Sequence, residues 1–206
     1  MRDNRIPAIV LFGAPGVGKG TQGAVLNAIP GFLHVSSGDI FRALDPDSPE
    51  GREVAQYAPQ GKLVPDELTI RVFNAVLKEM IRRGEFDPDK EVLVLDGIPR
   101  TVTQAEILKQ TIDVLAVVQF DFIDDNVIVE RIKRRGERHN RPDDADEATI
   151  RHRFEVYRRE TEPLLQCFPA ERVHRVDADA TPVEVARNVL DALIPAIRIP
   201  TAVEKC

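Results

Sequence analysis

Apolar residues along this chain gather in short runs, and helix-like segments separate the runs from one another. The first run contains Ile, Val, Leu and Phe side by side, which is typical of a strand buried on both faces. We interpret five runs as strands, over residues 6–12, 32–35, 91–95, 114–122 and 172–176. Helices are expected over residues 22–29, 50–57, 66–83 and 182–193. This alternation predicts an α/β fold in which a five-stranded parallel sheet carries helices on both faces.

A glycine-rich segment follows the first apolar run directly. It consists of Gly13, Ala14, Pro15, Gly16, Val17, Gly18, Lys19, Gly20 and Thr21. Glycines let successive backbone N–H groups curl around an anion, and the helix that follows points its positive end at the same place. Lys19 adds a mobile positive charge that can follow a phosphoryl group during transfer. A strand, a glycine loop, a lysine and a helix in this order indicate a P-loop that binds a nucleotide.

The metal ligand of the general P-loop pattern is displaced here. Gly20 stands directly after Lys19, where that pattern has Ser or Thr. We therefore expect Mg²⁺ to bind with ATP, mainly through nucleotide oxygens and water. Asp96 ends a buried strand beside the loop, where it can hold a magnesium-bound water. The alternative role for Asp96 is an N-cap for the helix near Thr101.

Composition narrows the class of protein. A chain of 206 residues with a net charge of −6 can build one substantial core, and this charge argues against a protein that coats nucleic acid. No apolar stretch approaches the roughly 18 residues of a spanning helix, and the N-terminus runs into the first strand, so we expect a cytoplasmic protein with no membrane partner. We expect a monomer, because no long apolar stripe remains outside the core helices.

Cysteine and histidine spacing does not resemble that of a metal site. The two cysteines, Cys167 and Cys206, lack such spacing, so neither a disulfide framework nor a structural zinc site is expected. The four histidines share no metal-ligand spacing either, and we interpret them as structural.

Arginines are concentrated in residues 131–159, where nine of them stand against six acidic residues. Such a charge run is often only a solvated face. Arg131 and Arg135, however, are spaced i,i+4 on one helix face, and a second helix carries Arg153 beyond a short polar loop. Two helices that meet at this loop could close arginines over a triphosphate.

Together these segments make the chain similar to the adenylate kinases, a family of nucleoside monophosphate kinases. The shared motifs occur in the order and spacing of that family, and in combination they are highly specific. They are residues 13–21, 37–42, 61–67 and 96–101 with Gln104, Arg131, Arg135 with Gly136, Arg141 with Asp143 and Asp144, and Arg153.

The resemblance implies reversible, Mg²⁺-dependent transfer of the terminal phosphoryl group of ATP to AMP, which gives two ADP. It implies that ATP binds residues 13–21, Arg131 and Arg135. The residues implied at AMP are Ser37, Arg42, Val64, Gly97, Arg100, Gln104, Arg141 and Arg153. The implied catalytic residues are Lys19, Arg100, Arg135, Arg141 and Arg153.

The resemblance also implies a division of the chain. One P-loop kinase domain would span residues 1–206, with a monophosphate-binding insertion at about 37–65, a short lid without zinc at about 135–144, and a tail at 195–206.

Three positions bear on the acceptor site. Ser37 stands where Thr is commoner in AMP-specific members and Ala in pyrimidine-specific ones, and Ile98 replaces the family's usual Phe. Gln104 favours adenine, because its amide both donates and accepts. The alternatives are a UMP/CMP kinase and a non-catalytic ATP-binding switch. A switch would not need a second pocket lined by Arg42, Arg100 and Arg153.

Overall fold

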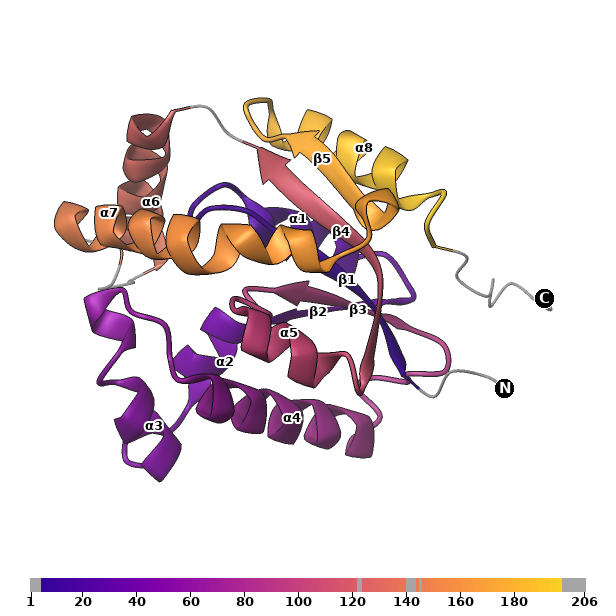
Figure 1. Ribbon diagram of the computed structural model, residues 1–206, viewed down its shortest axis with the longest axis horizontal. Coiled ribbons are helices and arrows are strands. Elements are labelled where there is room, and N and C mark those ends of the chain that lie inside the picture. The colour runs from indigo at the N-terminus through magenta and orange to yellow at the C-terminus, as the bar shows by residue number, and fades with distance from the viewer. Residues whose placement is uncertain (1–4, 122–123, 140–143, 145, 198–206) are drawn as a thin grey trace.

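A parallel five-stranded sheet forms the centre of the computed structural model, which describes residues 5–121, 124–139, 144 and 146–197 (Figure 1). The strand order is β2-β3-β1-β4-β5. The strands are β1 (Ile6–Phe12), β2 (Phe32–Ser36), β3 (Val92–Asp96), β4 (Ile112–Asp121) and β5 (Val173–Asp177). The predicted fold class is therefore confirmed, and each predicted strand coincides with an observed one except at its ends. The expected fourth strand reached Phe122, which lies outside the described residues.

Helices connect the strands, and most begin at a recognisable cap. They are α1 (Lys19–Asn27), α2 (Ser37–Ala43), α3 (Pro49–Val54), α4 (Asp66–Arg82), α5 (Val102–Leu108), α6 (Asp125–His139), α7 (Glu147–Val156) and α8 (Pro182–Leu193). Shorter turns are η1 (Ala58–Gln60), the π-helical η3 (Tyr157–Thr161), η4 (Glu162–Cys167) and η5 (Ala170–Arg172). A capping box of Thr181 and Glu184 starts α8 at the predicted residue.

Two predicted helices differ from the observed ones. The helix expected from residue 22 begins at Lys19, because Gly18 adopts a left-handed conformation (φ 112°) and turns the loop directly into the helix. The helix expected over residues 50–57 ends at Val54, and a separate turn follows that contains Pro59. The α-helical bonding ends before this proline, because Gln56 N donates to Glu53 O (3.1 Å) and Tyr57 N to Val54 O (3.0 Å), which are tighter i→i−3 bonds.

Alternate residues of β1 bury against opposite layers of helices. Val10 and Phe12 belong to a cluster with residues of α4 and α5, whereas Ile9 and Leu11 belong to a cluster with residues of α1 and α8. In Figure 1, α4 and α5 lie on one side of the strands and α8 lies on the other. Burial on both faces explains why the strands are continuously apolar.

Two smaller apolar clusters lie outside these layers. One joins α3 to α4 through Val54, Leu68 and Val72. The other joins α6 to α7 and contains Ile128, Val129, Ile132, Ile150 and Phe154. An ion pair of Lys133 with Glu147 (2.7 Å) and one of Arg158 with Asp125 add to the contact of α6 with α7 and η3.

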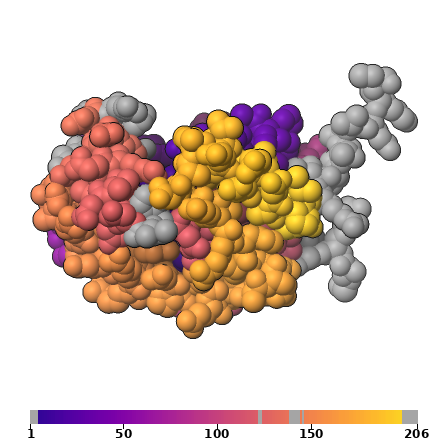
Figure 2. All heavy atoms as spheres, turned by 90° about the horizontal axis from the view of Figure 1, so that it is seen from above, coloured from indigo at the N-terminus to yellow at the C-terminus, as the bar shows by residue number. Residues whose placement is uncertain are grey.

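The arrangement leaves α6 and α8 apart at one end of the sheet. Seen from above, the salmon atoms of α6 and the yellow atoms of α8 lie on different sides, and the orange segment that includes α7 runs along a third (Figure 2). The strands are parallel, so their carboxyl ends meet at one edge of the sheet. After β1 the chain forms β2 and β3 on one side of β1, and then β4 and β5 on its other side. Ligands of open α/β sheets bind at this position.

No helix in the described part of the chain is long and apolar enough to cross a membrane.

Burial predicts different costs for the same substitution at two valines. Val94→Ala in β3 removes methyl groups from a side chain that is 0% exposed, and we expect it to lower the free energy of unfolding by about 2 kcal/mol. Val183→Ala, at a position 79% exposed, should change it by less than about 0.5 kcal/mol. Urea unfolding of both variants measures the difference, and equal costs would contradict the assigned burial.

Candidate functional site

A cleft of ≈ 1190 Å³ opens at the carboxyl ends of the strands. Its walls come from the P-loop, α2, residues 58–64, the end of β3, and α6 with α7. Predicted site residues that line it are Gly13, Pro15, Gly16, Val17, Gly18, Lys19, Gly20, Thr21, Ser37, Arg42, Val64, Asp96, Gly97, Arg100, Gln104, Arg131, Arg135 and Arg153. Ala14 is not part of the lining, and Arg141 lies outside the described residues.

The P-loop encloses the ammonium group of Lys19. Its Nζ donates to the carbonyl oxygens of Gly13 (2.8 Å) and Ala14 (2.9 Å). The loop also packs closely against α6, because a Cβ at Gly16 would lie 2.4 Å from Ile132. With φ at 80°, Gly16 has a conformation and a contact that only glycine accommodates.

Burial lowers the pKa of Lys19 to about 8, because the charged form loses water. The carboxylate of Asp96 opposes this effect, while the positive charges of Arg100, Arg135 and Arg153 add to it. The lysine is therefore a poorly solvated cation among other cations, and an anion in the cleft would stabilise its charge.

Asp96 faces the cleft from the end of β3. The N-cap of α5 is Thr101, whose side chain accepts from Gln104 N, so the alternative of Asp96 as the cap of this helix is wrong. Burial alone would raise the pKa of Asp96, but His34 and the charges of Lys19 and Arg100 hold it below its usual range. The Nε2 of His34 lies 3.7 Å from Asp96 Oδ2. Asp96 is thus an ionised carboxylate at the phosphate loop.

One carbonyl oxygen joins three predicted residues. Gly97 O accepts from Ser37 Oγ (2.7 Å) and from Arg100 Nε (2.8 Å). Gly97 has φ 75°, and a Cβ there would lie 2.7 Å from the serine oxygen and 2.8 Å from the guanidinium. Burial and the nearby Arg153 lower the pKa of Arg100, and Asp96 opposes them.

Arg42 extends from α2 beside this group. Its guanidinium covers Gly38 and forms an ion pair with Asp39. Arg42 is also near enough to Arg100 for its charge to lower the pKa of that residue further.

A single carboxylate holds two arginines of the α6 and α7 helices. Asp144, 0% exposed, accepts from Arg135 Nε (2.8 Å) and Nη2 (2.9 Å) and from Arg153 Nη1 (2.8 Å). Burial alone would raise the pKa of Asp144, but the two guanidinium groups hold it below its usual range. Gly136 permits this approach, since a Cβ there would lie 2.9 Å from Asp144 Cβ.

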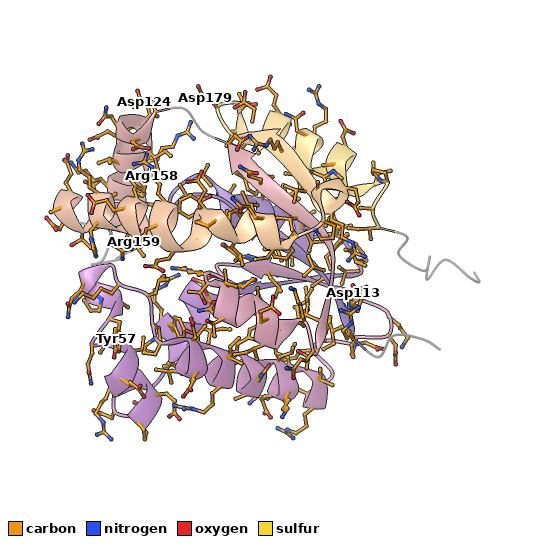
Figure 3. All side chains as sticks on the ribbon, viewed as in Figure 1. Tyr57, Asp113, Asp124, Arg158, Arg159 and Asp179 are labelled. Carbon is orange, nitrogen blue, oxygen red and sulfur yellow. The ribbon has the colours of Figure 1, made fainter. Side chains whose placement is uncertain are left out.

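Two further predicted residues that line the cleft contact acidic side chains. Arg131 on α6 has a guanidinium nitrogen 4.0 Å from Asp179, which Figure 3 labels in the turn before α8. Gln104 on α5 donates to Asp66 Oδ1 (2.8 Å) and accepts from Arg100 N (2.7 Å).

Sequence reasoning missed the roles of three residues at the site. Asp66 and Asp144 belong to the shared motifs, but their contacts were not predicted, and His34 was interpreted as structural although it lines the cleft. The available signal for Asp144 is an acidic residue inside an arginine-rich segment. An acidic residue is favourable in the first turn of a helix, and this role alone accounts for Asp66 in the sequence. Nothing in the sequence therefore indicates its contact with Gln104.

We expect an NMR titration of the nucleotide-free protein to give Lys19 a pKa of about 8, against an ordinary value of 10.5. The unfolded chain then holds this proton to a higher pH than the folded protein does. The group therefore increases the free energy of unfolding as pH rises from about 8 to 10.5. Asp96→Asn should lower the pKa of Lys19 further, because it removes the attracting charge. An unshifted Lys19 would contradict the enclosure of its ammonium group.

Comparison with known proteins agrees with this geometry. A family model described as adenylate kinase matches residues 11–173. An adenylate kinase of Corynebacterium diphtheriae is 39% identical over 192 residues, which cover 90% of this chain and 98% of that protein. One from a Synechococcus species is 36% identical over 200 residues (94% and 98%), and one from Thermus thermophilus is 37% identical over 193 residues (90% and 96%). The chain therefore belongs to the adenylate kinase family of phosphotransferases.

Proposed function

We propose that this protein catalyses the reversible transfer of the terminal phosphoryl group of ATP to AMP, which yields two ADP. The observation that carries the proposal is one cleft that joins a P-loop to a second, arginine-lined wall with Ser37, Arg42 and Arg100. A nucleotide-dependent switch would share the loop and Asp96 but would have no use for that second wall.

On the donor side, ATP phosphates bind residues 13–21 and displace the loop carbonyls from Lys19. The N–H groups of the loop and the start of α1 suit an anion. The base of ATP lies beside Arg131, near Ala178, Ala180 and Pro182, which line the cleft at the α8 end.

On the acceptor side, AMP binds between α2 and α5. Arg42 and Arg100 hold its phosphate, because planar guanidinium groups match phosphate oxygens in pairs. The remaining contacts come from Ser37, the backbone of Val64, Gly97 and Gln104.

The chemistry needs alignment and neutralisation of charge more than it needs a base. The attacking phosphate oxygen of AMP is already anionic, so no side chain has to remove a proton. Lys19, Arg100, Arg135 and Arg153 compensate the charge on the transferred group. We propose the same role for Arg141.

Arg135 and Arg153 must exchange partners for this step. They are held by Asp144 in the structure, and phosphoryl oxygens would take over as acceptors when both nucleotides are present. The carboxylate keeps the two guanidinium groups oriented until then, so less rotamer entropy is lost on binding.

The residues near the P-loop fit a magnesium ion that arrives with ATP. Asp96 offers one ionised carboxylate, and within the described residues no three His, Cys, Asp or Glu side chains come together as a metal site. Nucleotide oxygens and water would therefore supply most ligands, with Asp96 holding a water. When bound, Mg²⁺ supplies further neutralisation of phosphate charge.

We propose that residues of about 37–65 form the monophosphate-binding insertion and residues of about 135–144 a short lid without zinc, in a single kinase domain with a tail from residue 195. The separate apolar clusters of α3 with α4 and of α6 with α7 support two parts that move over the core to exclude water. The cytoplasmic location and the monomeric state remain predictions.

Removing the central charges should abolish most of the activity. We expect Lys19→Met and Arg100→Ala each to lower kcat about 100- to 1,000-fold with the fold intact. Lys78→Met on α4 and Arg187→Ala on α8 remove the same charges from exposed positions and should leave kcat unchanged. A coupled assay of ADP formation measures all four, and near-normal turnover of Lys19→Met or Arg100→Ala would refute the assignment.

The acceptor is tested by the same assay with Mg-ATP and, separately, AMP, dAMP, CMP, UMP and GMP at equal concentration. We expect rapid turnover with AMP, because Ser37 keeps a hydroxyl and Gln104 an amide at the acceptor site. Preference for CMP or UMP would favour the pyrimidine kinase. Absence of transfer to every acceptor would favour a non-catalytic nucleotide-binding protein.

A further inference from the structure

The side-chain amide of Gln104 is fixed by the protein at both ends. Its Oε1 accepts from the backbone N–H of Arg100 (2.7 Å), and its Nε2 donates to Asp66 Oδ1 (2.8 Å). Gln104 lines the cleft and is only 2% exposed. An amide at the acceptor site is therefore held before any nucleotide binds.

Asp66 holds Gln104 from outside the cleft. It is the first residue of α4, and the same Oδ1 also accepts from Thr101 Oγ1 (2.9 Å), the N-cap of α5. Asp66 itself does not line the cleft. Its contact with Gln104 is thus a link between α4 and α5, separate from any contact with a ligand.

The chemistry of the two partners permits one orientation of the amide. A carboxylate only accepts hydrogen bonds, and a backbone N–H only donates them. Turning the amide of Gln104 by 180° would place its oxygen against Asp66 and its NH₂ against the N–H of Arg100. Both bonds would be lost in a buried place, which costs about 1–3 kcal/mol for each group left unsatisfied.

After these two bonds, the amide retains one N–H donor and one acceptor lone pair on Oε1. Adenine offers the complementary pair, an acceptor at N1 and a donor at its 6-amino group. Hypoxanthine and guanine have the reverse, N1–H and O6. An amide free to turn could pair with either pattern, whereas an amide held in one orientation can satisfy its remaining donor and acceptor only with the first.

We propose that Asp66 is a positioning residue that makes the acceptor site select 6-amino over 6-oxo purines, by locking the amide of Gln104. This inference rests on the proposed function, because it assumes that a monophosphate base pairs with Gln104. Selectivity then depends on a carboxylate that never touches the nucleotide.

The test compares AMP with IMP, which differ at the 6-position and in the proton on N1. We measure kcat/KM for each acceptor with saturating Mg-ATP. The wild-type protein should prefer AMP by about 100-fold. In Asp66→Asn, Gln104 faces an amide that can either donate or accept, so both orientations of Gln104 become possible. The AMP:IMP ratio of kcat/KM should then fall by about 10-fold or more. We expect KM for AMP to rise and KM for IMP to fall. The KM for ATP should not change.

Glu67→Gln is the matched control. It removes one negative charge from the same first turn of α4 at an exposed position, and it should leave the AMP:IMP ratio and the melting temperature as in the wild type. Thermal melting also shows whether Asp66→Asn is folded under the assay conditions.

The outcomes separate the two proposals. An unchanged AMP:IMP ratio in folded Asp66→Asn, or a wild-type protein that uses AMP and IMP equally, would overturn the role of Asp66 and leave the kinase activity standing. A wild-type protein that phosphorylates neither acceptor would overturn the proposed function and this inference together. A reduced ratio in Asp66→Asn but not in Glu67→Gln would support both.

Discussion

Repulsion among like charges is the constraint that the cleft must satisfy before any nucleotide arrives. Burial lowers the pKa of Lys19 most, and the charges of Arg100, Arg135 and Arg153 are near enough to lower it further, against the opposing charge of Asp96. Each of these four cations has an acceptor within the protein. Asp144 accepts from Arg135 and Arg153, Gly97 O accepts from Arg100, and the loop carbonyls accept from the lysine ammonium. These contacts allow several positive charges to lie close together in the cleft when no nucleotide is bound.

The topology of the sheet determines where the positive residues of the cleft lie. Parallel strands bring the loop after β1 and the end of β3 to one edge, and the same register sets Ser36 of β2 opposite Asp96. The arginines of α6 and α7 come from a part of the chain with its own apolar cluster. The cleft therefore combines a wall from the core of the sheet with a wall from helices that have an apolar cluster of their own.

The sequence predicted the parts of the site whose signal is local. The order of strand, glycines and lysine predicts the phosphate loop, and the periodicity of residues 182–193 predicts α8 with its observed bounds. Contacts between distant positions carry no such signal. The bond of Asp66 to Gln104 joins residues 38 positions apart, and Asp144 reaches arginines of two helices. Even the start of α1 depended on the backbone conformation of one glycine, which composition does not reveal.

The π-helical turn η3 sets how the helix that carries Arg153 is rotated about its own axis. Helical conformation continues from α7 through η3 and η4, and its two ends are anchored differently: Phe154 packs on α6, whereas Leu164 packs in the core beneath the sheet. A π turn accommodates an extra residue in a helix. Without that residue, one end would turn by about 100° relative to the other, so Arg153 and Leu164 could not both keep their present contacts. The π turn thus sets the rotation of α7 relative to η4, so that Arg153 can face the cleft while Leu164 packs in the core.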